Sequence, residues 1–198
     1  MTDTNWAIIE QMIEKIMDDC MGENLYYGLK EKLNGKTLAI EFTNSEGSSF
    51  YFDGETSKIK LSIVNMESNH LLHEMFHAFQ AYQETWSSYV NAGLNLEIEA
   101  HYAQYLYLKK LQEFPGSKWS SDYASNPRLI STMLLEQCLT PKGELALDYS
   151  EEELDGYLNF ACNAFKEDLA YMQFKYDTSR KGLENFQNLK NLTKDCGL

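Results

Sequence analysis

The spacing of apolar residues changes twice along the chain, and this change constrains the fold more than any other feature. Apolar residues recur at helical spacing over 4–20, and a shorter helical pattern covers 24–33. In three runs that follow, near 37–44, 48–53 and 58–64, apolar and polar residues alternate, as they do in strands. Beyond them the pattern is helical again, and we expect helices at 68–84, 94–112, 127–138, 150–175 and 180–193.

Short polar segments separate the three strand-like runs. "NSEG" at 44–47 and "DGET" at 53–56 are typical of hairpin connections. They predict a three-stranded antiparallel meander from about 37 to 64. Helices, a small sheet and then more helices indicate the α+β class. A chain of 198 residues without a linker-like segment indicates a single domain, 1–198.

The composition excludes several kinds of partner. The net charge of −13 repels phosphate backbones and anionic bilayers, so we expect no nucleic acid and no membrane surface among the partners. No apolar run approaches the length of a membrane span. The acidic, amphipathic N-terminal segment is unlike a signal peptide, and the four cysteines form no C-x-x-C pair. We therefore expect a cytoplasmic protein with thiol cysteines, while two disulfides stay open for an exported one.

The segment "HLLHEMFHAFQAYQ" at 70–83 contains an H-E-x-x-H pattern, His73 to His77. Residues four apart share one face of a helix, so both histidines can direct a ring nitrogen at one ion. Glu74 flanks that ion and can accept a proton from a water held there. Imidazole ligands with an open position for water favour Zn²⁺, although manganese or iron could occupy the same ligands.

A catalytic site of this kind requires a third protein ligand, which the next predicted helix can supply. Glu97, Glu99 and His101 are the candidates. Glu97 and His101 share a face with apolar neighbours, whereas Glu99 is rotated by about 200° from Glu97 and lies on a more mixed surface. We favour Glu97 as the ligand and expect Glu99 to be solvated, with Glu99 and His101 kept as alternatives.

The pattern H-E-x-x-H followed downstream by E-x-x-A resembles the gluzincins, which are zinc metallopeptidases. The resemblance covers about 57–108 and implies His73, His77 and Glu97 as zinc ligands with Glu74 as the catalytic base. His101 stands where many members have Asp, so it becomes a candidate for orienting a ligand or for stabilising an oxyanion. The resemblance also implies a zincin-like fold in which an edge strand binds extended peptide, and the run at 58–64 is the candidate strand.

The sequence thus predicts a zinc-dependent peptidase that acts on peptides or proteins. Two other classes remain open. One is a zincin-like module that binds metal or peptide without catalysis, for example as a regulator. The other is a helical protein in which the pattern arose by chance.

Overall fold

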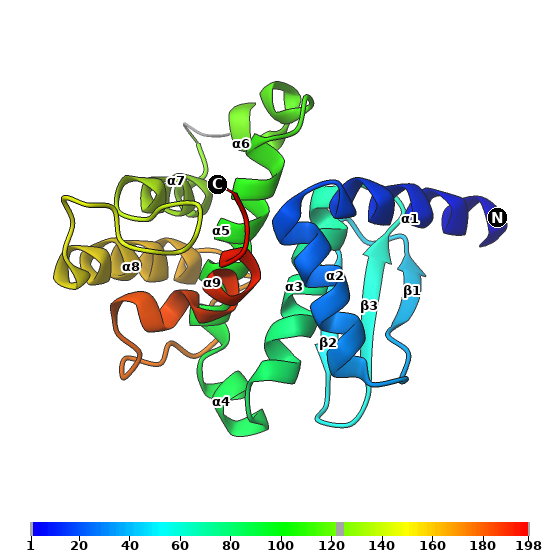
Figure 1. The fold of residues 1–198 in the computed structure, drawn as a ribbon, viewed down its shortest axis with the longest axis horizontal. Coiled ribbons are helices and arrows are strands. Elements are labelled where there is room, and N and C mark those ends of the chain that lie inside the picture. Colours follow the sequence, from blue (N-terminus) through cyan, green and yellow to red (C-terminus); the bar gives the residue numbers. More distant parts are fainter. Residues whose placement is uncertain (1, 122–124, 198) are drawn as a thin grey trace. The chain divides into compact units, whose positions relative to one another are not determined.

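The computed structural model describes residues 2–121 and 125–197. The contacts divide the chain into two compact units, Met1–Trp86 and Ser87–Leu198, and each is described by itself. Figure 1 gives the element labels used below. The expectation of one domain over 1–198 stays a prediction.

The described part of the first unit forms three helices and three strands. Its elements are α1 (Thr2–Met17), α2 (Cys20–Leu33), β1 (Ala39–Thr43), β2 (Ser49–Phe52), β3 (Ser57–Ser62) and α3 (Ser68–Gln83). The break between α1 and α2 has a local cause, because the Asp19 side chain accepts hydrogen bonds from the N–H groups of Met21 and Gly22 and so caps α2. At the other end of α2, Asn34 adopts a left-handed conformation with φ of 46° and stops the helix.

The sheet differs from the predicted meander. The strand order is β1-β3-β2, with β3 in the centre. β1 pairs with β3 in parallel, and β2 pairs with β3 in antiparallel orientation. The antiparallel meander is therefore wrong, and so is the expectation that the run at 58–64 forms an edge strand. Only the β2–β3 connection is a hairpin.

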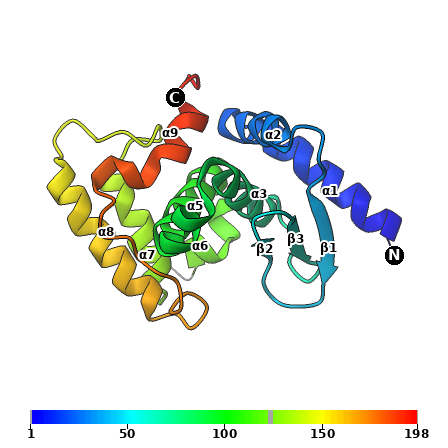
Figure 2. The ribbon, with the colours of Figure 1, turned by 90° about the horizontal axis from the view of Figure 1, so that it is seen from below.

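Helix α3 occupies the core of the first unit. It contacts α1, α2, β2 and β3. Figure 2 shows α2 on one side of α3 and the strands on the other. The side chains at the centre are almost fully buried, among them Ile16, Leu25, Ile59 and Phe76. This packing explains why α3 is apolar nearly all round its axis.

The second unit is built around α5 (Gly93–Lys109). The other elements are α4 (Trp86–Asn91), η1 (Phe114–Gly116), α6 (Lys118–Ser121), α7 (Pro127–Leu134), η2 (Leu135–Gln137), α8 (Glu151–Lys166), η3 (Gly182–Phe186) and α9 (Gln187–Thr193). Helix α5 contacts α7, α8, η3 and α9. Side chains from Leu94 to Leu108 are buried on nearly every face of α5.

The α+β class is confirmed, and most predicted helices form close to their expected bounds. Helix α8 ends at Lys166, well before the predicted 175, and α4 was not expected. Cys138 and Cys162 are free thiols as expected, but Cys20 and Cys196 are disulfide-bonded. Among the described residues, no helix is both long and apolar enough to cross a bilayer.

Candidate metal centre

Helix α3 brings the two histidines of the H-E-x-x-H pattern together. The Nε2 atoms of His73 and His77 lie 3.0 Å apart. The rings are nearly perpendicular, with an interplanar angle of 87°. Both side chains are buried, and so is Glu74 between them in sequence. The close approach of the two histidines agrees with the shared helix face that their spacing predicts.

Gln80 holds the ring of His77 in place. Its Oε1 lies 2.9 Å from Nδ1 of His77, one further turn along α3. An amide oxygen can only accept, so Nδ1 carries the proton and donates to it. In the neutral imidazole, Nε2 then presents its lone pair toward His73. A hydrogen bond of this kind commonly orients a metal-binding histidine.

Glu97 belongs to the first turns of α5 and is partly buried. His73, His77 and Glu97 each offer one ligand atom, and these atoms lie within 4.8 Å of one another. This group could hold a metal ion. It contains Glu97 and neither Glu99 nor His101, and the choice of Glu97 as the third ligand stays a prediction.

The donor set fits a zinc ion. Two nitrogen ligands on a tetrahedral centre with bonds of about 2.0–2.1 Å are separated by roughly 3.3 Å. The observed separation of 3.0 Å between the two Nε2 atoms is close to that value. Two imidazoles and one carboxylate are also the ligand types found at catalytic zinc sites with an open position.

Glu99 has a different environment from the one expected. The side chain is 1% exposed, so the prediction that it is solvated is wrong. One carboxylate oxygen accepts from the Nδ2 of Asn188 at 2.8 Å, and the other accepts from the backbone N–H of Leu189 at 2.9 Å. Glu99 therefore joins α5 to the start of α9. Helix periodicity predicted that Glu97 and Glu99 differ, but it could not show that both faces of α5 are covered.

His101 lies beside Glu97 and contacts a residue that the sequence did not single out. Its Nδ1 donates to the backbone oxygen of Glu97 at 2.9 Å, and its Nε2 accepts from the guanidinium of Arg128. Tyr171 Oη lies 3.3 Å from the same Nε2, and Asp168 forms an ion pair with Arg128 at 3.4 Å. This cluster fixes the ring next to Glu97. A role for His101 in the reaction itself stays a prediction.

Arg128 had no recognisable signal in the sequence. It is the second residue of α7 and follows Pro127, far from the H-E-x-x-H pattern. Its guanidinium lies over the rings of Phe165 and Tyr171, at 5.7 and 5.1 Å from their centroids. Such contacts between distant segments cannot be read from local spacing.

No protein-family model, curated protein or solved structure matches this chain significantly. The likeness to gluzincins therefore depends on the residues described above. The zincin-like fold stays a prediction.

Proposed function

We propose that this chain is a zinc-dependent peptidase of gluzincin type. The observation that carries the proposal is the 3.0 Å approach of the two Nε2 atoms of His73 and His77. Glu97 supports it as the third member of the same potential ligand group. Manganese or iron would use the same donor atoms, but two imidazoles and one carboxylate suit zinc well.

Each residue has one role in the proposed reaction. His73, His77 and Glu97 would hold the ion, and Gln80 keeps His77 in the tautomer that leaves Nε2 free of a proton. Bound zinc would polarise the substrate carbonyl and make a water more acidic. Glu74 accepts the proton of the attacking water and then passes it to the leaving amine. Burial of Glu74 limits competition from bulk water for that proton.

The proposed substrate is an extended peptide. β2 is an edge strand of the sheet and also contacts α3, whereas β3 is central and has both edges paired. A peptide could add to β2 and continue the sheet. The proposal thus transfers the substrate-binding edge from the run at 58–64 to β2 (Ser49–Phe52).

The experiment compares wild type with Glu74→Gln in digests of a peptide mixture, analysed by mass spectrometry with and without a zinc chelator. An amide cannot accept the proton, so cleavage should fall by at least about a hundredfold. Zinc affinity should stay within about threefold, because Glu74 is not a ligand in this scheme. Glu31→Gln, an exposed change on α2 with the same loss of charge, is the matched control and should behave as wild type.

Three outcomes would change the assignment. Undiminished cleavage by Glu74→Gln would exclude Glu74 as the base. Loss of zinc in that variant would make Glu74 a ligand or a structural residue. Stoichiometric zinc in wild type without cleavage of any peptide would favour a binding module over a peptidase.

A further inference from the structure

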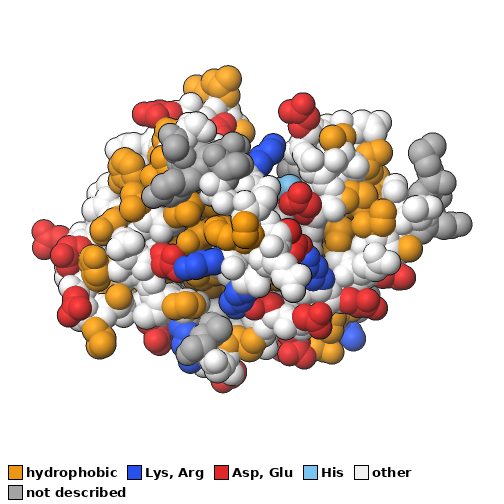
Figure 3. All heavy atoms as spheres, turned by 90° about the horizontal axis from the view of Figure 1, so that it is seen from above, with side chains coloured by type: hydrophobic (Ala, Val, Ile, Leu, Met, Phe, Trp, Pro, Cys, Tyr) orange, Lys and Arg blue, Asp and Glu red, His pale blue; other side chains and the backbone are white. Residues whose placement is uncertain are grey.

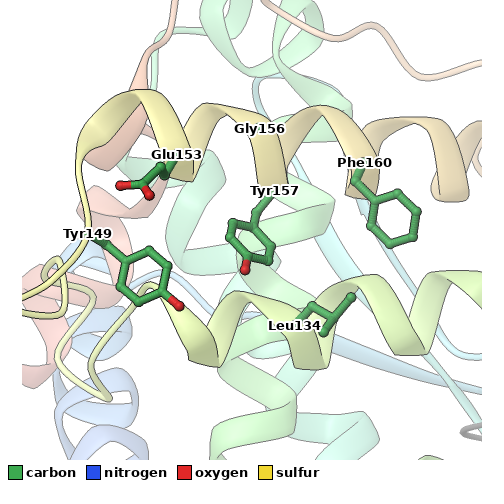
Figure 4. A pocket seen from close by; sticks show the side chains of 6 residues that line it. All are labelled: Leu134, Tyr149, Glu153, Gly156, Tyr157 and Phe160. Atoms are coloured by element: carbon green, nitrogen blue, oxygen red, sulfur yellow. The ribbon is translucent and has the colours of Figure 1, made fainter.

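A shallow pocket lies on the second unit, between α7 and the beginning of α8. Its volume is about 440 Å³, and it is lined by Leu134, Tyr149, Glu153, Gly156, Tyr157 and Phe160. Figure 4 shows Tyr149 and Tyr157 side by side, with Phe160 further along α8. This volume falls in the range of pockets that hold small molecules.

Three of the described lining residues are aromatic, namely Tyr149, Tyr157 and Phe160. The rings of Tyr149 and Tyr157 have centroids 6.4 Å apart and meet at 66°. Phe160 lies three residues after Tyr157, hence on the same face of α8, and its side chain is 49% exposed. Partial burial raises the pKa of Tyr157, so its phenol is neutral at ordinary pH. The pocket is therefore bordered by the electron-rich faces of aromatic rings, among them the neutral phenol of Tyr157.

Among the described residues that line the pocket, Glu153 is the only charged one. Hydrogen bonds from the backbone and side chain of Ser150 hold the pKa of Glu153 below its usual value, so the carboxylate is ionised. Glu151 and Glu152 precede it and are exposed. Over the face of the molecule in Figure 3, acidic side chains are widely spread, with Lys and Arg side chains near its centre. The three consecutive carboxylates at the start of α8 make the potential beside the pocket negative.

Gly156 is the least expected member of the pocket lining. It occupies the interior of α8, where glycine costs about 0.5–1 kcal/mol relative to alanine. A Cβ added there would have no atom within 4 Å, so packing does not require glycine. The absence of a side chain does keep the pocket open beside Tyr157.

We propose that this pocket binds a small organic cation, namely an ammonium group that carries methyl or similar apolar substituents. Substituted ammonium groups are recognised by aromatic faces, and the ionised Glu153 adds attraction. The negative potential disfavours anions. A single carboxylate supplies too few oxygens for Ca²⁺, which takes six to eight. This inference is independent of the proposed peptidase activity.

The test compares choline with its neutral isostere, 3,3-dimethyl-1-butanol, in titrations of the full chain followed by ¹H–¹⁵N NMR. Choline should give saturable shifts at residues of the pocket lining and bind at least about fivefold more tightly than the isostere, since a cation–π contact contributes roughly 1 kcal/mol. Equal binding of the two compounds would overturn the proposal. So would shifts confined to other residues, or the absence of a saturable shift.

Two variants with controls locate the site. Glu153→Gln should keep the capping box with Ser150, because glutamine can take the place of glutamate in a capping box. This variant should bind choline about threefold more weakly, or worse. Glu152→Gln removes the same charge outside the pocket and should weaken choline binding less than Glu153→Gln does. Gly156→Leu should abolish binding while the Tm stays equal or rises, as expected for a better helix former. Unchanged binding in Gly156→Leu would place the ligand elsewhere.

Discussion

Replacement of Glu99 separates fold stability from metal binding most clearly. One oxygen of its carboxylate accepts a hydrogen bond from Asn188 and the other accepts one from the backbone of Leu189, and the residue is 1% exposed. Glu99→Gln turns one acceptor into a donor that faces another donor. The loss of one hydrogen bond to a charged group costs about 1.5–3 kcal/mol, and a buried unsatisfied donor adds to this.

The expected effect can be expressed as a shift of the unfolding temperature. For a chain of this size, 1 kcal/mol corresponds to about 2–4 °C in Tm. Glu99→Gln should therefore lower the Tm of the metal-free protein by roughly 5–10 °C in scanning calorimetry. Glu97→Gln is the matched control, because it makes the same change two residues away on α5. Its metal-free Tm should fall by less than about 3 °C.

The two variants should rank in the opposite order in zinc affinity, with the larger loss in Glu97→Gln. In a competition titration against a zinc chelator, Glu97→Gln should lose well over the ten- to hundredfold typical of outer-shell changes. Glu99→Gln should bind zinc within about threefold of wild type. If Glu99→Gln kept its Tm but lost zinc, Glu99 would be the ligand and the assignment of both carboxylates would be reversed.

Two further changes test individual contacts. Gln80→Leu removes the acceptor for the Nδ1–H of His77 and should weaken zinc binding by about 10- to 100-fold; unchanged affinity would show that this bond does not orient the ligand. Hydrogen bonds from the hydroxyl and the backbone N–H of Ser179 lower the pKa of Asp177. The ionised carboxylate therefore stabilises the fold at neutral pH, and this stabilisation is lost as the pH falls through the lowered pKa. Ser179→Ala should raise the pKa of Asp177 in an NMR titration, and an unaltered pKa would contradict a role for the hydroxyl.

The sequence predicted the local elements well because local spacing determines them. The helix at 68–84 forms as α3 over Ser68–Gln83, and its buried histidines follow from a pattern that is apolar all round. The predicted 150–175 helix ended early for a reason that local spacing does not show. After Lys166 the chain turns, and Tyr171 packs against Phe165 with ring centroids 5.2 Å apart.

Strand order could not be predicted in the same way. The turn-like segments at 44–47 and 53–56 suggested that each strand pairs with the next. Neighbours in sequence are adjacent in a sheet only about two-thirds of the time, and here β1 pairs in parallel with β3. The burial of Glu99 and the contact of Arg128 with His101 were missed for the same reason, because both depend on segments distant in sequence.

Zinc stoichiometry tests the central claim most directly. The full chain is purified without chelators, incubated with excess zinc, freed of unbound metal and analysed for metal and protein content. The account predicts about one zinc per chain for wild type and far less for the double variant His73→Ala/His77→Ala at equal concentration. A wild-type protein that retains no stoichiometric zinc after this treatment would contradict the metal centre and the peptidase proposal with it.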